Sequence, residues 1–126
     1  MAWVFQSDQP LYAQLVEQIT LAILSGGYAP GERMLAVREL AAQAGVNPNT
    51  VQRAMGELEQ LGLIRSQRTS GRFVTEDAAV IQNAKEELAA ARLRDFLTAM
   101  ERLGYDKSDV LQLLREKEES NGASGM

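Results

Sequence analysis

Apolar residues recur at helical spacing near the start of the chain. After Asp8 and Pro10, every fourth position is apolar, at Leu11, Leu15, Ile19 and Ile23. This is the period of one face of an α-helix, and Pro10 suits its first position. Ser25-Gly26-Gly27 interrupts the pattern, so we predict a helix over residues 10–25.

Two further helical segments follow, separated by a short break. The first has apolar residues at Val37, Leu40, Ala41 and Ala44, and Gly45 interrupts it. Asn47 is a good N-cap and Pro48 a good first residue for the next helix, whose apolar positions are Val51, Ala54, Met55, Leu58 and Leu61. Two helices joined by a tight turn that contains glycine form a helix-turn-helix motif.

The polar face of the third helix has a composition suited to reading DNA. At about 100° per residue, the side opposite the apolar face carries Asn49, Gln52, Arg53, Gly56 and Gln60. Asn and Gln can pair with adenine and Arg with guanine, and the first turn of such a helix enters the major groove. An ordinary solvated helix is the alternative reading of the same residues.

A predicted β-hairpin comes next, with its turn at Thr69-Ser70-Gly71. Its base is apolar and its tip carries arginines, the relevant residues being Leu63, Ile64, Phe73, Val74, Arg68 and Arg72. A basic hairpin directly after a helix-turn-helix is a wing, which contacts phosphates while the helix reads bases. Alternatively, the hairpin only closes the hydrophobic core.

The last third of the chain predicts a helical hairpin. From Asp77, a possible N-cap, a long amphipathic helix carries Ile81, Ala84, Leu88, Ala91, Leu93, Phe96, Leu97, Met100 and Leu103. Gly104 ends it, and Asp106 or Ser108 caps a second, short helix with Val110, Leu111 and Leu114. This hairpin is too small to bury its own apolar stripe. The stripe therefore needs a partner, either a second copy of the chain or the N-terminal domain.

These patterns define the expected organisation. The chain has 126 residues, of which 45% are apolar and 24% charged, which suits one globular core with an appendage. We predict a mainly α fold with a small β-hairpin. A winged helix-turn-helix domain spans residues 1–76, a helical dimerisation region spans 77–119, and a disordered tail spans 120–126.

The charge distribution favours nucleic acid more than the net charge of -4 does. Between Arg33 and Arg72 the chain has six basic and three acidic residues, hence +3, whereas residues 77–126 have seven basic and ten acidic residues, hence -3. Every basic residue before Lys85 is an arginine, and arginine suits bidentate contacts with phosphate and guanine. On charge alone, these arginines could also simply solvate a surface.

Most enzyme chemistry is excluded by composition. The chain has no cysteine and no histidine, which removes thiolate ligands, Ser–His and Cys–His pairs and the usual proton shuttle. The acidic pairs Glu86-Glu87 and Glu118-Glu119 are better explained as solvated helix surface. We expect no catalytic residue, metal or cofactor. No apolar stretch approaches the roughly 20 residues of a membrane span, and the N-terminus lacks the regions of a signal peptide, so we expect a cytoplasmic protein.

An ordered series of motifs resembles the GntR family of bacterial winged-helix transcription regulators, and most closely its small YtrA-type branch. The resemblance covers residues 9–75. The matching segments are Gln9-Pro10-Leu11-Tyr12-Ala13-Gln14-Leu15, Pro30-Gly31-Glu32-Arg33, Val37-Arg38-Glu39-Leu40-Ala41, Gly45-Val46-Asn47-Pro48-Asn49-Thr50-Val51-Gln52-Arg53-Ala54, Leu58-Glu59-Gln60-Leu61-Gly62 and Ser70-Gly71-Arg72-Phe73-Val74.

The resemblance implies DNA contacts by Arg38 and, from the third helix, by Asn49, Thr50 and Arg53. It also implies that Gly71 lets the wing approach DNA closely. The chain departs from the family pattern at Met34-Leu35-Ala36, where Leu-Pro-Ser is usual. Ala36 cannot cap the second helix as serine would, a loss of about 1 kcal/mol.

We therefore predict a sequence-specific DNA-binding regulator, a dimeric repressor that binds a palindromic operator in double-stranded DNA. The DNA-contacting set is Arg38, Asn47, Asn49, Thr50, Gln52, Arg53, Arg68, Ser70, Gly71 and Arg72. The YtrA-type resemblance favours a homodimer, with the interface formed by Ile81, Ala84, Leu88, Phe96, Leu97, Met100, Val110, Leu111 and Leu114. The alternative function is a winged helix that binds a protein partner instead of specific DNA. No residue pattern identifies a small-molecule effector.

Overall fold

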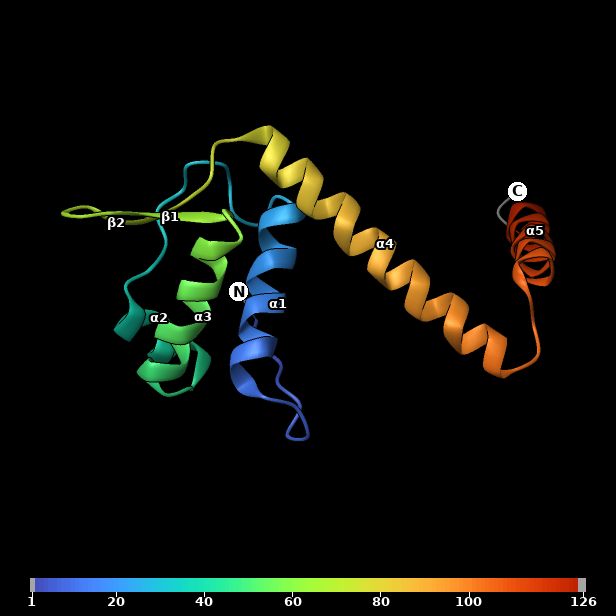
Figure 1. Ribbon diagram of the computed structural model, residues 1–126, viewed down its shortest axis with the longest axis horizontal. Helices are drawn as coiled ribbons and strands as arrows, with labels where there is room; N and C mark the ends of the chain where they lie inside the picture. The colour runs from blue at the N-terminus through green and yellow to red at the C-terminus, as the bar shows by residue number, and fades with distance from the viewer. Residues whose placement is uncertain (1, 125–126) are drawn as a thin grey trace. The chain divides into compact units, whose positions relative to one another are not determined.

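The computed structural model describes the backbone of residues 2–124 and the side chains of residues 2–119. The chain divides into two compact units, Met1–Lys85 and Glu86–Met126. Helices α1 (Leu11–Leu24), α2 (Val37–Ala44) and α3 (Pro48–Gln60) are followed by strands β1 (Ile64–Gln67) and β2 (Gly71–Val74) (Figure 1). The predicted order of three helices and a hairpin is confirmed, and α1 lies within one residue of its predicted bounds at each end.

The core of the first unit lies where α1 and α2 both pack against α3. The predicted apolar face of α3 is the buried one, formed by Val51, Ala54, Met55 and Leu58. These residues meet a single buried cluster from the other elements, namely Leu15, Ile19, Ile23, Met34, Leu40, Ala41, Leu63, Ile64 and Val74. Burial of these side chains is the main term that holds the helix-turn-helix together.

The wing contains a third, very short extended segment that sequence patterning did not reveal. β1 and β2 pair antiparallel with Ile64 opposite Val74 and Gln67 opposite Gly71. On the other side of β2, Arg33 forms an isolated antiparallel bridge with Phe73. Met34 N donates to Arg72 O at 2.8 Å and Val74 N donates to Glu32 O at 2.8 Å. The loop before α2 is therefore attached to the wing by backbone hydrogen bonds.

A buried glutamine attaches the N-terminal segment to α1. Gln14 is 6% exposed. Its Nε2 donates to Gln6 O at 2.8 Å and to Gln9 O at 3.0 Å, and its Oε1 accepts from Gln6 N at 2.7 Å. Gln18 Nε2 donates to Val4 O at 2.7 Å. These bonds hold residues 3–6 against α1 and bring Trp3 and Phe5 to the edge of the core.

Helix α4 (Ala78–Arg102) begins where the sequence predicted. Asp77 Oδ1 accepts from Ala79 N at 2.9 Å, which confirms Asp77 as its cap. Ile81 and Ala84, two of the predicted dimer-interface residues, are partly buried against the core of the first unit together with Val80. A helix that leaves a small domain covers the apolar surface nearest to its own first turns.

Helix α5 (Lys107–Ser124) is longer than the short helix that was predicted. Asp106 and Asp109 cap it reciprocally: Asp109 N donates to Asp106 Oδ1, and Asp106 N donates to Asp109 Oδ2, both at 2.9 Å. Its backbone is described as helical to Ser124, within the segment 120–126 for which the sequence predicted disorder. Residues 125 and 126 lie outside the described residues.

The second unit leaves most of its large apolar side chains in solvent. Helices α4 and α5 do not pack along each other in the described part of the chain. The exposed fractions are 57% for Leu93, 44% for Phe96, 54% for Leu111 and 55% for Leu114. Leu88, Leu97 and Met100 are half-buried, and Val110, another predicted interface residue, is already buried within the single chain at 4% exposure.

Candidate nucleic-acid interface

The outward side of α3 carries the predicted base-reading residues. Asn49, Gln52 and Arg53 are exposed, and Thr50 is half-buried. Pro48 is the first residue of the helix, and Asn47 Oδ1 accepts from Asn49 N at 2.8 Å. The side-chain oxygen of Asn47 is therefore used in the N-cap hydrogen bond. Asn47 fixes the start of α3 and retains only its side-chain amide nitrogen for DNA.

Arg53 is held by an aromatic ring from α1. Its guanidinium carbon lies 3.7 Å from the centre of the Tyr12 ring. Stacking of this kind favours the cation and leaves the N–H groups at the edge of the guanidinium available for hydrogen bonds. Two hollows of about 420 and 440 Å³ flank the pair, the first lined also by Asn49 and Thr50, the second also by Gly56 and Gln60.

Tyr12 was not among the predicted site residues. In the sequence it belongs to the apolar positions of the first helix, and helical spacing alone gave no reason to separate it from core residues. Its position across from the polar face of α3 follows from the packing of α1 against α3, which no local pattern specifies.

The tip of the wing is a three-residue turn between Gln67 and Gly71. Arg68 and Ser70 are exposed, and Arg68 has no ion-pair or hydrogen-bond partner among the described residues. Gly71 has φ +103°, a region that favours glycine. A Cβ at this position would lie 3.4 Å from Arg33 Nε, so glycine here serves both the turn and the close passage of Arg33.

Arg72 is tied to α3 within the protein. Its Nε donates to Glu59 Oε1 at 2.7 Å, and Ser66 Oγ donates to the same oxygen at 2.5 Å. The hydrogen bonds from Ser66 and Arg72 lower the pKa of Glu59. Arg72 therefore uses one of its N–H groups to connect the wing to the end of α3. Arg68 keeps all the N–H groups of its guanidinium available.

Arg33 is a further cation on this surface, and it was not among the predicted DNA-contacting residues. It is exposed, and its guanidinium lies beside Gly71 at the wing because the backbone at Arg33 bridges to Phe73. In the sequence, Arg33 adds to the charge of the region and ends the segment Pro30-Gly31-Glu32-Arg33, but neither feature places it at the wing. The signal that identifies it is the bridge between the loop before α2 and β2, a contact between segments that are distant in sequence.

Arg38 is the second residue of α2 and is exposed. The N-cap of this helix is Ala36, which makes no side-chain hydrogen bond, as its chemistry predicts. Arg38 therefore lies at a helix start whose backbone N–H groups lack a side-chain acceptor, an arrangement favourable to an anion such as phosphate.

Within the described residues, no helix is long and apolar enough to cross a membrane. Over the same part of the chain, no group of three or more acidic side chains is arranged to hold a metal ion.

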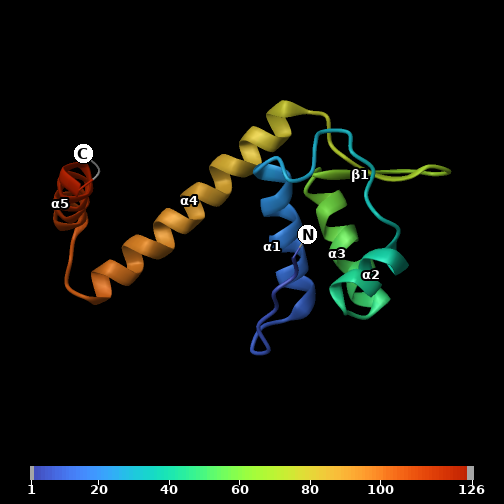
Figure 2. The ribbon, with the colours of Figure 1, turned by 180° about the vertical axis from the view of Figure 1, so that it is seen from behind.

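A helix with an amide-rich and arginine-bearing outer face, next to a basic hairpin, defines the class of winged helix-turn-helix proteins. Figure 2 shows α3 between α1 and α2, with the hairpin projecting beside them. The family model described as "Bacterial regulatory proteins, gntR family" matches residues 11–74. The chain belongs to the GntR family, and it is a DNA-binding transcription regulator.

Two relatives from Bacillus subtilis (strain 168) resemble most of the chain. YhcF, described as an uncharacterized HTH-type transcriptional regulator, is 37% identical over 108 residues, which are 86% of this chain and 89% of YhcF. The HTH-type transcriptional repressor YtrA is 30% identical over 112 residues, 88% of this chain and 86% of YtrA. The resemblance thus extends beyond the winged helix into the C-terminal helices.

Two solved structures are similar to this chain, one over most of its length and one over a shorter part. A GntR family transcriptional regulator from Listeria monocytogenes is 35% identical, with a TM-score of 0.83, and the match covers 89% of this chain and 98% of that one. The DNA-binding domain of AraR, solved in complex with operator ORX1, is 32% identical, with a TM-score of 0.55, over 60% of this chain and 96% of that one.

Proposed function

We propose that this regulator is a repressor that acts as a homodimer, binds a palindromic operator and occludes a promoter. The observation that carries the proposal is the exposed row of Asn49, Gln52 and Arg53 on a helix whose other face is buried. In a protein of this size, one such helix reads only a few base pairs. A second copy related by two-fold symmetry places another recognition helix about one DNA turn away.

Base readout is assigned to Asn49, Gln52 and Arg53, because amides pair with adenine and arginine with guanine. Arg38 and Arg68 are assigned to phosphates, because both guanidinium groups are exposed and neither is ion-paired among the described residues. The supporting contacts come from Asn47, Thr50, Ser70, Gly71 and Arg72. Arg72 supports the wing through Glu59 and contributes less to the phosphate contacts than Arg68 does.

The proposed dimer interface lies in the second unit. Phe96, Leu111 and Leu114 are large apolar residues that the single chain leaves exposed, and Leu88, Leu97 and Met100 are only partly covered. Burying such side chains contributes about 25 cal/mol per Å² of apolar surface.

We place the protein in the cytoplasm, where an operator is accessible, and assign it no catalytic activity. The supporting observations are a surface suited to DNA and the absence of histidine and cysteine from the sequence.

The decisive experiment is binding of the full chain to a duplex from upstream of its own gene, followed by fluorescence anisotropy at several salt concentrations. A shuffled duplex of the same composition is the control. We expect a preference of about a thousandfold or more for the upstream duplex, and an affinity that falls steeply with salt. If binding is weak and equal for both duplexes, selection from random sequences decides between an operator elsewhere and no specific DNA binding. Failure of that selection overturns the proposal and favours a winged helix that binds a protein.

A further inference from the structure

A cavity of about 500 Å³ lies in the first unit, away from the recognition face of α3. Its wall includes Trp3 from the N-terminal segment, Tyr28 and Glu32 from the loop after α1, Leu35, and Gln43 from α2. Small-molecule sites in proteins have volumes of about 300–1,000 Å³. The cavity is therefore large enough for an organic ligand.

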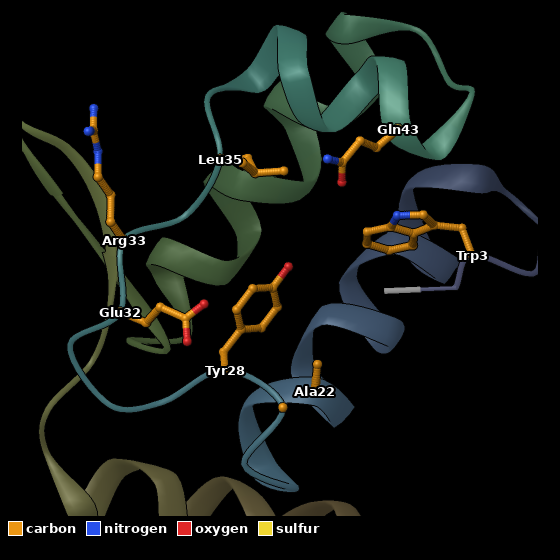
Figure 3. Close-up of a pocket in the computed structure, with 8 residues that line it drawn as sticks. Trp3, Ala22, Tyr28, Glu32, Arg33, Leu35 and Gln43 are labelled. Carbon is orange, nitrogen blue, oxygen red and sulfur yellow. The ribbon is translucent and has the colours of Figure 1, made fainter.

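The aromatic residues of this wall are held in place. Trp3 stacks on Phe5, with ring centres 6.0 Å apart and an angle of 10° between the planes. The backbone near Trp3 is fixed by the bond from Gln18 to Val4 O, and Tyr28 N donates to Ala22 O at 3.1 Å. Figure 3 shows the Trp3 and Tyr28 side chains on opposite sides of the space below Gln43.

Two charged residues, Glu32 and Arg33, line the cavity, and their side chains point in different directions. In Figure 3 the Glu32 carboxylate is turned toward Tyr28, whereas the Arg33 side chain points away from the other labelled residues. The Arg33 guanidinium lies instead beside Gly71 at the wing. Burial, together with the negative charge of Glu32, raises the pKa of Tyr28, so this ring stays a neutral phenol at physiological pH.

The carboxylate of Glu32 remains able to interact with a ligand. Its Oε1 accepts from Ala29 N at 2.9 Å, which fixes the orientation of the carboxylate. No cationic side chain is paired with Glu32 among the described residues. Glu32 is exposed, so its carboxylate is accessible, and a positively charged ligand would supply the counter-charge that it lacks.

We propose that this cavity binds an organic cation, a quaternary or protonated amine with an apolar body. Aromatic faces attract such a cation through the negative charge of their π-systems, and a nearby carboxylate adds a direct electrostatic attraction. Leu35 and Ala22 supply apolar contacts for the body of the ligand. The Trp3 and Tyr28 rings, together with Glu32, determine the preference for positive charge.

The site adjoins the segment that positions the proposed DNA contacts. Glu32 and Leu35 lie in the loop that bridges to β2 through Arg33 and leads directly into α2, which carries Arg38. A ligand in the cavity would therefore change the position of these two arginines. This effect on DNA rests on the proposed function, whereas binding of the cation does not.

The binding test uses the intrinsic fluorescence of the full chain, because Trp3 is its single tryptophan. The probe is benzyltrimethylammonium, and benzyl alcohol and benzoate provide the same ring with neutral and negative groups. We expect a saturable change with the cation and an affinity about tenfold or more above that of either control. Equal affinity for the three compounds, or no saturable change with the cation, overturns the proposal.

Three variants locate the site. Glu32→Gln keeps the shape and the acceptor for Ala29 N, and we expect the cation to bind about tenfold more weakly. Tyr28→Phe keeps the aromatic face and should retain binding. Glu101→Gln, the same change of charge in the second unit, is the matched control and should have no effect. Unaltered binding by Glu32→Gln, with a normal thermal melt, overturns the assignment.

The effect on DNA is measured by repeating the anisotropy assay with and without benzyltrimethylammonium. We expect the operator affinity to change in the wild-type chain and to stay constant in Glu32→Gln. Fluorescence binding with unchanged operator affinity refutes the regulatory role alone. Fluorescence binding by a chain that recognises no operator refutes the proposed function and leaves the cation site standing.

Discussion

At the scale of single residues, the side chains of the DNA-facing surface fall into exposed groups and groups with partners inside the protein. Arg53 is stacked on Tyr12, Asn47 caps α3, and Arg72 is bonded to Glu59. Arg68 is exposed and has no such partner among the described residues. Arg68 and Arg72 both belong to the wing, but only Arg72 has a partner inside the protein. Substitution of each is therefore expected to have a different outcome.

Replacing Arg53 by Ala should weaken operator binding by about 1–3 kcal/mol and relax specificity at one base position, because a bidentate contact to guanine is lost. Anisotropy against the operator and a set of single-base variants measures both effects. Tyr12→Phe keeps the aromatic face under Arg53 and is the control that should bind normally. Normal binding by Arg53→Ala would remove this residue from the recognition face.

Lowering the pH should weaken the hydrogen bonds that join the wing residues Ser66 and Arg72 to Glu59. Because its pKa is lowered in the folded protein, Glu59 contributes stability at pH values above its unfolded pKa. This contribution is lost as the pH falls through the folded value. Glu59→Gln should cost about 1 kcal/mol at neutral pH, and the difference from wild type should shrink as the pH falls below the range in which an ordinary glutamate titrates. Thermal melts of both proteins across this range test it, and a pH-independent difference would contradict the assignment.

At the scale of elements, the start of α2 and the tip of the wing depend on single positions. Ala36 leaves α2 without a side-chain cap, and Gly71 adopts a backbone conformation that other residues avoid. Both elements present cations of the proposed interface, Arg38 in one case and Arg68 in the other. Changes at these two positions should therefore affect stability and DNA binding in separable ways.

Ala36→Ser should stabilise the first unit by about 1 kcal/mol, because serine can accept a hydrogen bond from the first turn of α2. The measurement is the free energy of unfolding in urea. Ala42→Ser, at an exposed position inside the same helix, offers no cap and should be slightly destabilising. Equal effects of the two substitutions would show that capping is not the cause.

Gly71→Ala should destabilise the wing by about 1 kcal/mol or more, since alanine is strained at this positive φ. We expect weaker binding to all duplexes, with specificity retained, because the proposed function assigns the wing to phosphates and not to bases. Gly56→Ala is the control, because a Cβ there meets nothing within 4 Å. It should stabilise α3 by up to about 1 kcal/mol.

At the scale of the whole molecule, the first unit has a closed core, whereas the second unit leaves large apolar side chains in solvent. Exposed apolar surface of this kind is characteristic of interaction sites. The sequence alone predicted the interface as one stripe from Ile81 to Leu114. The structure divides this stripe, because Ile81 and Ala84 complete the core of the first unit and Val110 is buried in the second.

Phe96→Glu should convert the proposed dimer to a monomer, because it places a charge in the apolar interface. Sedimentation equilibrium of the variant and the wild type gives the oligomeric state. Thr98→Glu adds the same charge on the same helix at an exposed polar position and should remain dimeric. A wild-type chain that is monomeric at concentrations sufficient for operator binding would refute the dimer.

The sequence determined the elements and much of the recognition surface. Apolar spacing predicted α1 and the buried face of α3, Asn47-Pro48 predicted the start of α3, and Asp77 predicted the start of α4. These features depend on contacts within a few residues, which local patterns record. The outward row of Asn49, Gln52 and Arg53 followed from the same helical period.

Only the tertiary structure decided which of these side chains have partners. The stacking of Arg53 on Tyr12, the bond between Arg72 and Glu59, the passage of Arg33 along β2 and the cavity between Trp3 and Tyr28 all join segments that lie far apart in the chain. Helical and strand periods state which face a residue occupies, but not which distant residue faces it. That pairing follows from the packing of α1, the loop before α2 and the wing around α3, which brings together residues that are distant in the sequence.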